Sequence, residues 1–332
     1  MLFTKKLIRA LSLSLAVLSA LSFTACGKVP KSTEEERATV LTVDEYAVPY
    51  EQLRYFVRNY MNEYGDASFW TEERAAELSE KIFADTFESL RTEYAILSLA
   101  KRYGIERTDK AIEELVNGQI DAMIEEYPSV SDYVEDMAKN HLTDSVYRFL
   151  LTVTACSEEL YYAMLEAGDI EPDDEAIEPI VRSDSFVRVK QILIANDPGE
   201  DKAKNRQKAE EALGRAIAGE DFDTLVKEYG EDLYMFNNTD GYYICRGVWY
   251  REFEDTAFSL GIGEISGIIE TAAGYSILVR CEKEDAYMDS HMESLCDSYR
   301  DAQFSLSIEK KAAEMTIATN ETFDSYTLLT ID

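Results

Sequence analysis

Histidine and closely spaced cysteine are the chemically active residues that this sequence most lacks. The 332 residues include 2 histidines, His141 and His291, and 5 cysteines, none of them in a Cys-x-x-Cys pair. Zinc sites and dithiol redox motifs depend on such closely spaced ligands. We therefore expect no metal site and no cofactor. The four cysteines after Cys26 are far apart, which leaves open whether they form disulfides or stay buried as free thiols.

Basic residues are also few. The chain has 33 Lys and Arg against 65 Asp and Glu, a formal net charge of -32. Nucleic acid is excluded as a partner because phosphate binding needs Lys and Arg. Contact with anionic lipid headgroups is disfavoured for the same reason. The simplest role of the excess acid is solubility through mutual repulsion. With 46% hydrophobic residues, the chain can form about two folded domains.

Only one long apolar run occurs, and it lies at the N-terminus. Lys5, Lys6 and Arg9 precede an uncharged, mostly apolar run over residues 10–25. This run is shorter than the ~20 apolar residues that a helix needs to span a bilayer. It ends in small residues, as export signals do. We predict that residues 1–25 are a signal peptide.

The end of this run resembles the lipobox of bacterial lipoproteins. Residues 23–26 read Phe-Thr-Ala-Cys and precede Gly27, with Phe23 where the family usually has Leu. The resemblance implies a diacylglyceryl group on Cys26, cleavage just before it, and a place on the extracytoplasmic face of a bacterial membrane. Residues 26–37 would then be a polar tether. The alternative is an ordinary secreted protein with a stray cysteine.

Residues 38–182 have mainly helical spacing. A strand and turn at 39–48 precede Pro49, which begins a helix with apolar residues on one face: Leu53, Phe56, Val57, Tyr60 and Met61. Further helices are predicted at about 71–103, 108–127, 130–140 and 144–166. An acidic segment at 168–174 contains Pro172 and is predicted to be a linker.

The pattern changes at residue 186. Strands are predicted at 186–195, 241–246 and 274–281, and helices at 202–219, 222–229 and 250–260. Helical spacing returns at 287–316, and a strand is predicted at 326–331. We therefore predict an α+β protein. Residues 38–182 and 285–332 are predicted to form a helical domain, into which an α+β domain at 185–283 is inserted.

The inserted segment resembles the parvulin (PpiC-type) rotamase domain. The matching motifs occur in order: 187–194 (VRVKQILI), 219–225 (GEDFDTL), 246–247 (RG), 253–258 (FEDTAF), 263–266 (GEIS) and 271–275 (TAAGY). The whole layout is similar to that of PrsA-like foldase lipoproteins and, more distantly, SurA-like periplasmic chaperones. In these families a helical chaperone domain surrounds or precedes such a module, which implies that residues 38–182 and 285–332 form a helical chaperone-like domain.

The resemblance also implies site residues. Trp249 and Phe253, with Phe258, fall at the positions of the apolar cup that holds substrate. Four positions match the family's polar cluster: Gln191, Asp232, Thr271 and Ser276. Two of these four positions carry histidine in the family, and here they are Gln191 and Ser276. Both side chains can still donate and accept hydrogen bonds.

Three functions are therefore open. The first is a lipid-anchored peptidyl-prolyl cis-trans isomerase, active or weak, that assists the folding of newly exported polypeptides. The second is a non-catalytic holdase chaperone for unfolded chains, with a degenerate parvulin-like domain. The third is a solute-binding lipoprotein, against which stands the lack of two similar α/β lobes. The sequence does not show whether the chain forms a homodimer.

Overall fold

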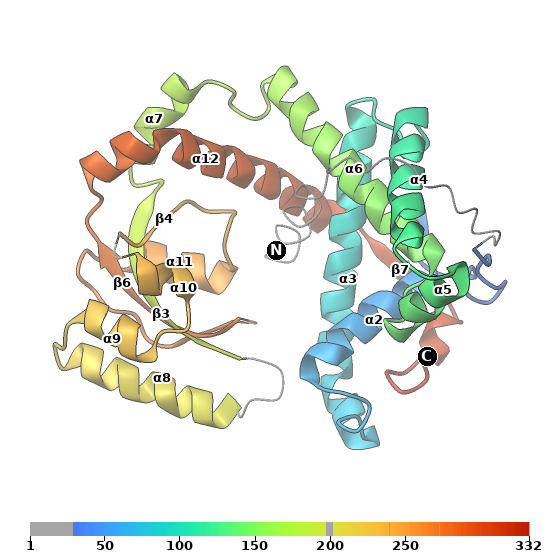
Figure 1. Ribbon diagram of the computed structural model, residues 1–332, viewed down its shortest axis with the longest axis horizontal. Coiled ribbons are helices and arrows are strands. Elements are labelled where there is room, and N and C mark those ends of the chain that lie inside the picture. Colours follow the sequence, from blue (N-terminus) through green and yellow to red (C-terminus); the bar gives the residue numbers. More distant parts are fainter. Residues whose placement is uncertain (1–28, 197–201, 239, 272, 332) are drawn as a thin grey trace. The chain divides into compact units, whose positions relative to one another are not determined.

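The computed structural model describes residues 29–196, 202–238, 240–271 and 273–331. The predicted signal peptide, 1–25, and Cys26 lie outside the described residues. The described chain divides into two compact units (Figure 1). One is Gly168–Leu306, and the other combines residues 29–167 with 307–331. The predicted domain boundaries at 182, 185, 283 and 285 stay a prediction.

The second unit is mostly helical. Its elements are β1 (Thr39–Val43), β2 (Tyr46–Pro49), α2 (Tyr50–Tyr64), α3 (Glu72–Arg102), α4 (Lys110–Glu125), α5 (Val130–Lys139) and α6 (Asp144–Ala167). Helix α3 packs against α2 and α6, and α4 packs against α6. The predicted stripe on α2 is buried at Leu53, Phe56, Val57 and Met61. Residues 32–37 fold back onto α2, where Glu36 pairs with Arg54 at 3.1 Å.

A distant strand completes the small sheet of this unit. Strand β7 (Ile317–Thr319) pairs with β1, and the strand order is β2-β1-β7. The strand predicted at 326–331 was wrong. Burial there falls on Leu328 and Ile331, three residues apart, whereas Leu329 is exposed. That spacing suits a turn, and the Thr327 carbonyl accepts hydrogen bonds from the backbone of Thr330 and Ile331.

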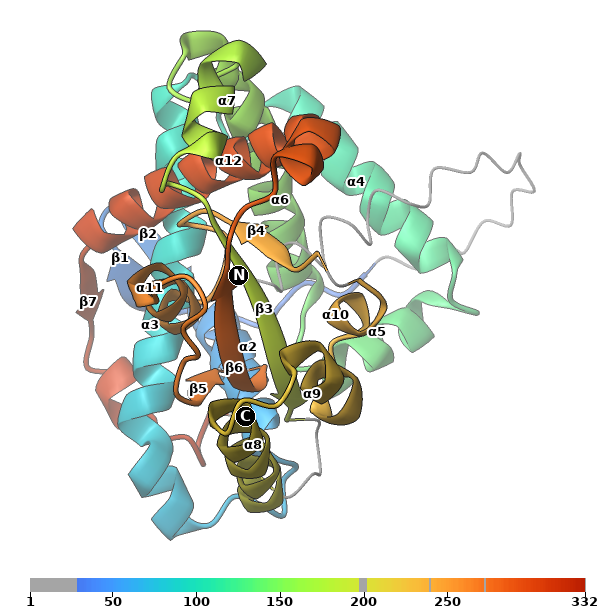
Figure 2. The same ribbon diagram turned by 90° about the vertical axis from the view of Figure 1, so that its left-hand side faces the viewer.

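The first unit is built on an antiparallel sheet with strand order β4-β3-β6-β5. The strands are β3 (Val187–Ala195), β4 (Tyr242–Ile244), β5 (Ile269–Thr271) and β6 (Gly274–Cys281). The two longest, β3 and β6, run side by side through its centre (Figure 2). Helices α8 (Lys202–Ile217) and α9 (Phe222–Tyr229) cover one face, packing on Ile192 and Ile194. Helix α11 (Arg251–Ser259) covers the other, packing on Val187, Val189 and Leu278.

Three elements of this unit were not predicted: α7 (Asp174–Arg182), α10 (Leu233–Asn237) and β5. Helix α7 has 9 residues with Pro179 inside, and α10 has 5, so neither offers enough turns for a periodic signal. The long helix α12 (Asp285–Glu314) begins in this unit. Ile177 and Val181 of α7 pack with Leu295 and Cys296 of α12. The α+β fold class predicted from the sequence is confirmed.

The cysteines that the sequence left undecided are free thiols. Cys156, Cys245 and Cys296 are buried, and Cys281 is half-buried. Within the described ranges, no helix is long and apolar enough to cross a membrane.

Candidate functional site

The sheet brings three of the predicted polar residues to its α11 face. Residues that face each other on antiparallel strands project from the same side of a sheet. Gln191 on β3 faces Leu278, and Ser276 on β6 faces both Leu193 and Ile269. Leu278 and Ile269 belong to the apolar cluster under α11, so Gln191 and Ser276 lie on that face. Both are buried, with 5% and 3% of their surface exposed.

Asp232 joins this face from the end of α9. Its Oδ1 atom accepts hydrogen bonds from the backbone of Tyr234 (2.9 Å) and Met235 (3.3 Å) and so caps helix α10. Its Oδ2 atom accepts from Gln191 Nε2 at 2.9 Å and from the Tyr242 hydroxyl at 2.7 Å. The structure therefore brings Gln191 and Asp232 together, as predicted positions of one cluster, and adds Tyr242.

Tyr242 is placed by the glycine before it. Gly241 has φ +80°, and a Cβ atom there would lie 2.6 Å from the Val189 carbonyl oxygen. Only glycine allows this close approach of β4 to β3. Burial and the hydrogen bond to Asp232 both raise the pKa of the Tyr242 hydroxyl above its ordinary value. The hydroxyl therefore keeps its proton and acts as the donor to Asp232.

The predicted cup residues stack on each other. The rings of Trp249 and Phe253 lie 4.9 Å apart at 15°, with Phe253 buried and Trp249 half-buried. Tyr242 meets Trp249 edge-on at 4.7 Å, and Tyr234 stacks on Tyr242 at 4.7 Å. Four aromatic rings thus form one continuous row beside Asp232. Each offset or edge contact of this kind adds about 0.5–1.5 kcal/mol beyond burial.

Phe258 shares its apolar cluster with the other two cup residues. It packs against the apolar cluster under α11, and the guanidinium of Arg246 lies 4.6 Å from its ring centroid. Arg246 in turn pairs with Asp255 at 2.7 Å. Phe258 therefore carries a cation–π contact at the edge of the cluster.

Glu254 holds the loop that carries Trp249. Its buried carboxylate accepts hydrogen bonds from the backbone N–H groups of Gly247, Val248 and Trp249, at 2.7–3.0 Å. In the sequence, Glu254 stands out only as part of a motif with Phe253. The signal that could have revealed its role is an acid on the buried side of a short helix, where it needs several donors.

The hydroxyl of Thr271 forms hydrogen bonds within its own turn. Its hydroxyl accepts from Ala273 N at 3.2 Å and donates to the Gly274 carbonyl at 3.5 Å, at the connection between β5 and β6. Gly274 faces Thr271 across this pair of strands. The bonded cluster in the described structure consists of Gln191, Asp232 and Tyr242. Thr271 and Ser276 remain proposed members.

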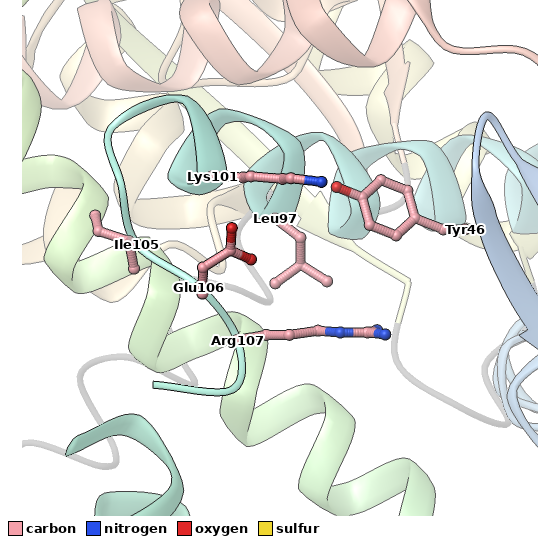
Figure 3. Close-up of a pocket in the computed structure, with 6 residues that line it drawn as sticks. All are labelled: Tyr46, Leu97, Lys101, Ile105, Glu106 and Arg107. Atoms are coloured by element: carbon pink, nitrogen blue, oxygen red, sulfur yellow. The ribbon is translucent and has the colours of Figure 1, made fainter. Parts of the chain in front are cut away.

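A small cavity of about 180 Å³ lies in the helical unit (Figure 3). It is lined by Tyr46, Leu97, Lys101, Ile105, Glu106 and Arg107. The Lys101 ammonium points toward the Tyr46 hydroxyl and lies 4.0 Å from Glu45. Among the lining residues, Lys101 and Arg107 are cationic and Glu106 is acidic. None of the predicted site residues lines this cavity.

Comparison with known proteins agrees with the geometry of the sheet unit. Residues 191–282 match the family model "Rotamase: PPIC-type PPIASE domain". The match begins at Gln191 and includes every residue of the Asp232 cluster and of the aromatic row. The chain therefore carries a PpiC-type PPIase domain, and the resemblance inferred from the motifs is confirmed.

Relatives extend the similarity beyond this domain. "Foldase protein PrsA" of Oceanobacillus iheyensis is 26% identical over 215 residues, 64% of this chain and 67% of that protein. "Foldase protein PrsA" of Halalkalibacterium halodurans is 27% identical over 218 residues, 64% of each chain. "Chaperone SurA" of Albidiferax ferrireducens is 24% identical over 217 residues, 63% of this chain and 47% of that protein. The matched part thus spans about two thirds of the first two relatives and about half of the third.

A solved structure was also found. The crystal structure of foldase protein PrsA from Streptococcus pneumoniae is 18% identical, covers 87% of this chain and 97% of that chain, and has a TM-score of 0.35.

Proposed function

We propose that this protein is an extracytoplasmic foldase, held on a membrane by lipid on Cys26, which binds newly exported polypeptides and isomerises their X-Pro bonds slowly. The observation that carries the proposal is the Asp232 carboxylate. This carboxylate accepts hydrogen bonds from Gln191 and Tyr242 and lies beside the stacked rings of Trp249 and Phe253. The similarity to PrsA foldases and SurA chaperones supports polypeptide substrates and a place outside the cytoplasm.

Isomerisation of an X-Pro bond requires few chemical groups in the site. Resonance in the X-Pro amide creates a rotation barrier of ~18–20 kcal/mol. Lowering it needs no nucleophile, only a dry surface for the proline ring and polar groups that favour the twisted amide. The stacked rings of Trp249 and Phe253 would receive the ring of proline. Gln191 and Asp232 would then lie on the polar side of the bound segment.

The residues at the two histidine positions suggest slow turnover. An amide and a hydroxyl form hydrogen bonds but do not gain or lose a proton near neutral pH, as an imidazole does. Because a carboxylate only accepts, the Gln191 amide presents its NH₂ group to Asp232. Gln191 would therefore orient Asp232 and stabilise a twisted carbonyl by hydrogen bonding alone.

Tyr242 supplies a second reason for slow turnover. Its ring lies against Trp249, and its hydroxyl donates a hydrogen bond to the Asp232 oxygen that also accepts one from Gln191. A proline ring that reaches Trp249 must share this surface with Tyr242. The same observation favours the second candidate function, a holdase that binds unfolded chains at this site without turning over their proline bonds.

A protease-coupled proline-peptide assay on the full chain separates the two functions. Turnover above the uncatalysed rate that falls at least about tenfold in Asp232→Ala would establish the isomerase. Glu210→Ala, which removes an exposed carboxylate on α8, is the matched control and should keep full turnover. No turnover, together with suppressed aggregation of an unfolded client, would establish the holdase. Failure in both assays would reject the proposal.

Lipid anchoring needs its own test. In a bacterial host that processes lipoproteins, the wild-type chain should partition into the membrane fraction and incorporate labelled fatty acid. Cys26→Ala should do neither. Equal membrane partition of both chains would contradict attachment through Cys26.

A further inference from the structure

Helix α10 turns three large apolar side chains outward. Leu233 is 78% exposed, Tyr234 41% and Phe236 48%. Nine large apolar side chains are exposed in the described chain, so a third of them fall within four consecutive positions. Scattered exposed apolar residues are ordinary, whereas a contiguous group of them marks an interaction surface.

The orientation of this helix is fixed. Met235, between the exposed residues, is buried in the core under α8 and α9. At the N-terminal end of α10, Asp232 caps the helix by accepting hydrogen bonds from the backbone of Tyr234 and Met235. Rotation of α10 that buried its exposed residues would therefore expose Met235 and break the hydrogen bonds of the Asp232 cap. The apolar group is a built surface and not a loosely held loop.

This surface is continuous with the aromatic row of the PPIase domain. Tyr234 stacks on Tyr242, which contacts Trp249. Asp232 links the two parts chemically, because one of its oxygens caps α10 and the other accepts from Gln191 and Tyr242. An extended segment bound at Trp249 would therefore pass over α10.

The charge around α10 indicates a basic partner. Residues 228–240 include four acids, Glu228, Glu231, Asp232 and Asp240, and no Lys or Arg. Glu228 pairs with Arg215, and Glu231 with Lys208. The hydrogen bonds to Asp232 come from an amide, a phenol and backbone N–H groups, which carry no charge. The field of this carboxylate favours cationic groups on whatever binds.

We propose that Leu233, Tyr234 and Phe236 form a docking surface for an extended segment of an unfolded client polypeptide that carries a bulky apolar side chain and a basic residue near its proline. The inference rests on the proposed function and deepens it by defining the substrate class. The proline would lie at Trp249 and Phe253. The bulky side chain would lie on α10 and the basic residue toward Asp232.

Fluorescence anisotropy with labelled peptides tests this surface on the full chain. The parent peptide carries one proline, one phenylalanine and two lysines in ten residues, and three analogues replace Phe by Ser, both Lys by Glu, or Pro by Ala. The protein variant is Leu233→Ser with Phe236→Ser, both on exposed positions. Ile217→Ser, at the last residue of α8 and 71% exposed, is the matched control. Circular dichroism checks that all three proteins are folded.

The wild-type chain and Ile217→Ser should bind the parent peptide about tenfold more tightly than the Ser analogue, since burying one Phe side chain is worth at least that factor. They should prefer the parent peptide over the Glu analogue by about the same factor, because the Asp232 carboxylate attracts lysine and repels glutamate. The double variant should lose the preference for Phe and keep the preference for Lys, because Asp232 is unchanged. Equal affinities of the double variant and the control for the parent peptide would overturn the docking surface. Equal affinities of the wild-type chain for the parent peptide and its Phe→Ser analogue would also overturn the docking surface.

The proline analogue separates this inference from the proposed function. A Phe preference that depends on α10, without any effect of Pro→Ala and without turnover or holdase activity, would reject the proposed function alone. An effect of Pro→Ala in every protein, without any role of α10, would reject the docking surface alone.

Discussion

The carboxylate of Asp232 accepts a hydrogen bond from the hydroxyl of Tyr242, with 2.7 Å between the two oxygens. The same oxygen accepts from Gln191. Two neutral side-chain donors thus hold one oxygen of this carboxylate. This pair fixes both the polar cluster and the aromatic row, because Tyr242 also contacts Trp249.

The first prediction concerns the coupling of this pair. A double-mutant cycle with Asp232→Ala and Tyr242→Phe should give a coupling free energy of about 1.5–3 kcal/mol in urea unfolding, as for hydrogen bonds to a charged group. Tyr243→Phe is the control partner, since the Tyr243 hydroxyl accepts from Glu284 N. Its cycle with Asp232→Ala should couple by less than about 0.5 kcal/mol. Additive effects for Tyr242 would show that the bond does not form.

The second prediction concerns Gly241. Gly241→Ala should lower the free energy of unfolding by about 2 kcal/mol or more, because its φ is +80° and the new Cβ would meet the Val189 carbonyl. Gly214→Ala is the matched control within α8, where the added methyl meets nothing within 4 Å. It should raise the free energy of unfolding by about 0.5–1 kcal/mol. Thermal and urea unfolding measure both. A tolerated Gly241→Ala would contradict the β3–β4 approach.

The third prediction concerns Glu254. In a Trp70→Phe background, Trp249 is the sole tryptophan. Glu254→Gln turns an NH₂ group toward backbone donors and should cost about 2–3 kcal/mol of stability, with a red shift of Trp249 emission as its loop loosens. Glu252→Gln, exposed on the same helix, should leave both unchanged. Unchanged emission in Glu254→Gln would show that the loop does not depend on this carboxylate.

The fourth prediction concerns the thiol of Cys156. Burial raises its pKa to about 11 from an ordinary value of 9.0. Since the folded state holds this proton more tightly than the unfolded state, the contribution to stability is complete below pH 9 and is lost as pH rises through 11. At pH 8 the native thiol should resist iodoacetamide, and labelling should be fast in denaturant. Peptide mass spectrometry checks both, and fast native labelling would contradict the buried site.

The sequence predicted most of the elements because their periodicity is strong. The long helices α3, α6 and α12 and the strands β3 and β6 lie within a few residues of their predicted bounds. In contrast, β7 was missed, because only its pairing with β1, nearly 280 residues away, distinguishes it from a loop. Helix α10 was missed because five residues give no periodic signal.

For the candidate site, the sequence motifs predicted which residues belong to it, and the structure showed the hydrogen bonds between them. Gln191 and Asp232 were predicted as members of a cluster from motif positions separated by 41 residues, and they do meet. The roles of Tyr242 and Glu254 could not be predicted. Each depends on which backbone or side-chain donor approaches a buried carboxylate, and that geometry is set by tertiary packing. Thr271 shows the converse, since its hydroxyl serves the local turn.

The most direct test of a prolyl-binding surface at Trp249 and Phe253 is the fluorescence of Trp249. In the Trp70→Phe chain, emission is followed while the lysine- and phenylalanine-bearing proline peptide, and separately its Pro→Ala analogue, are added. We expect a saturable change with the proline peptide and at least about tenfold weaker binding of the analogue. Superimposable titrations, or emission that neither peptide alters, would contradict the account.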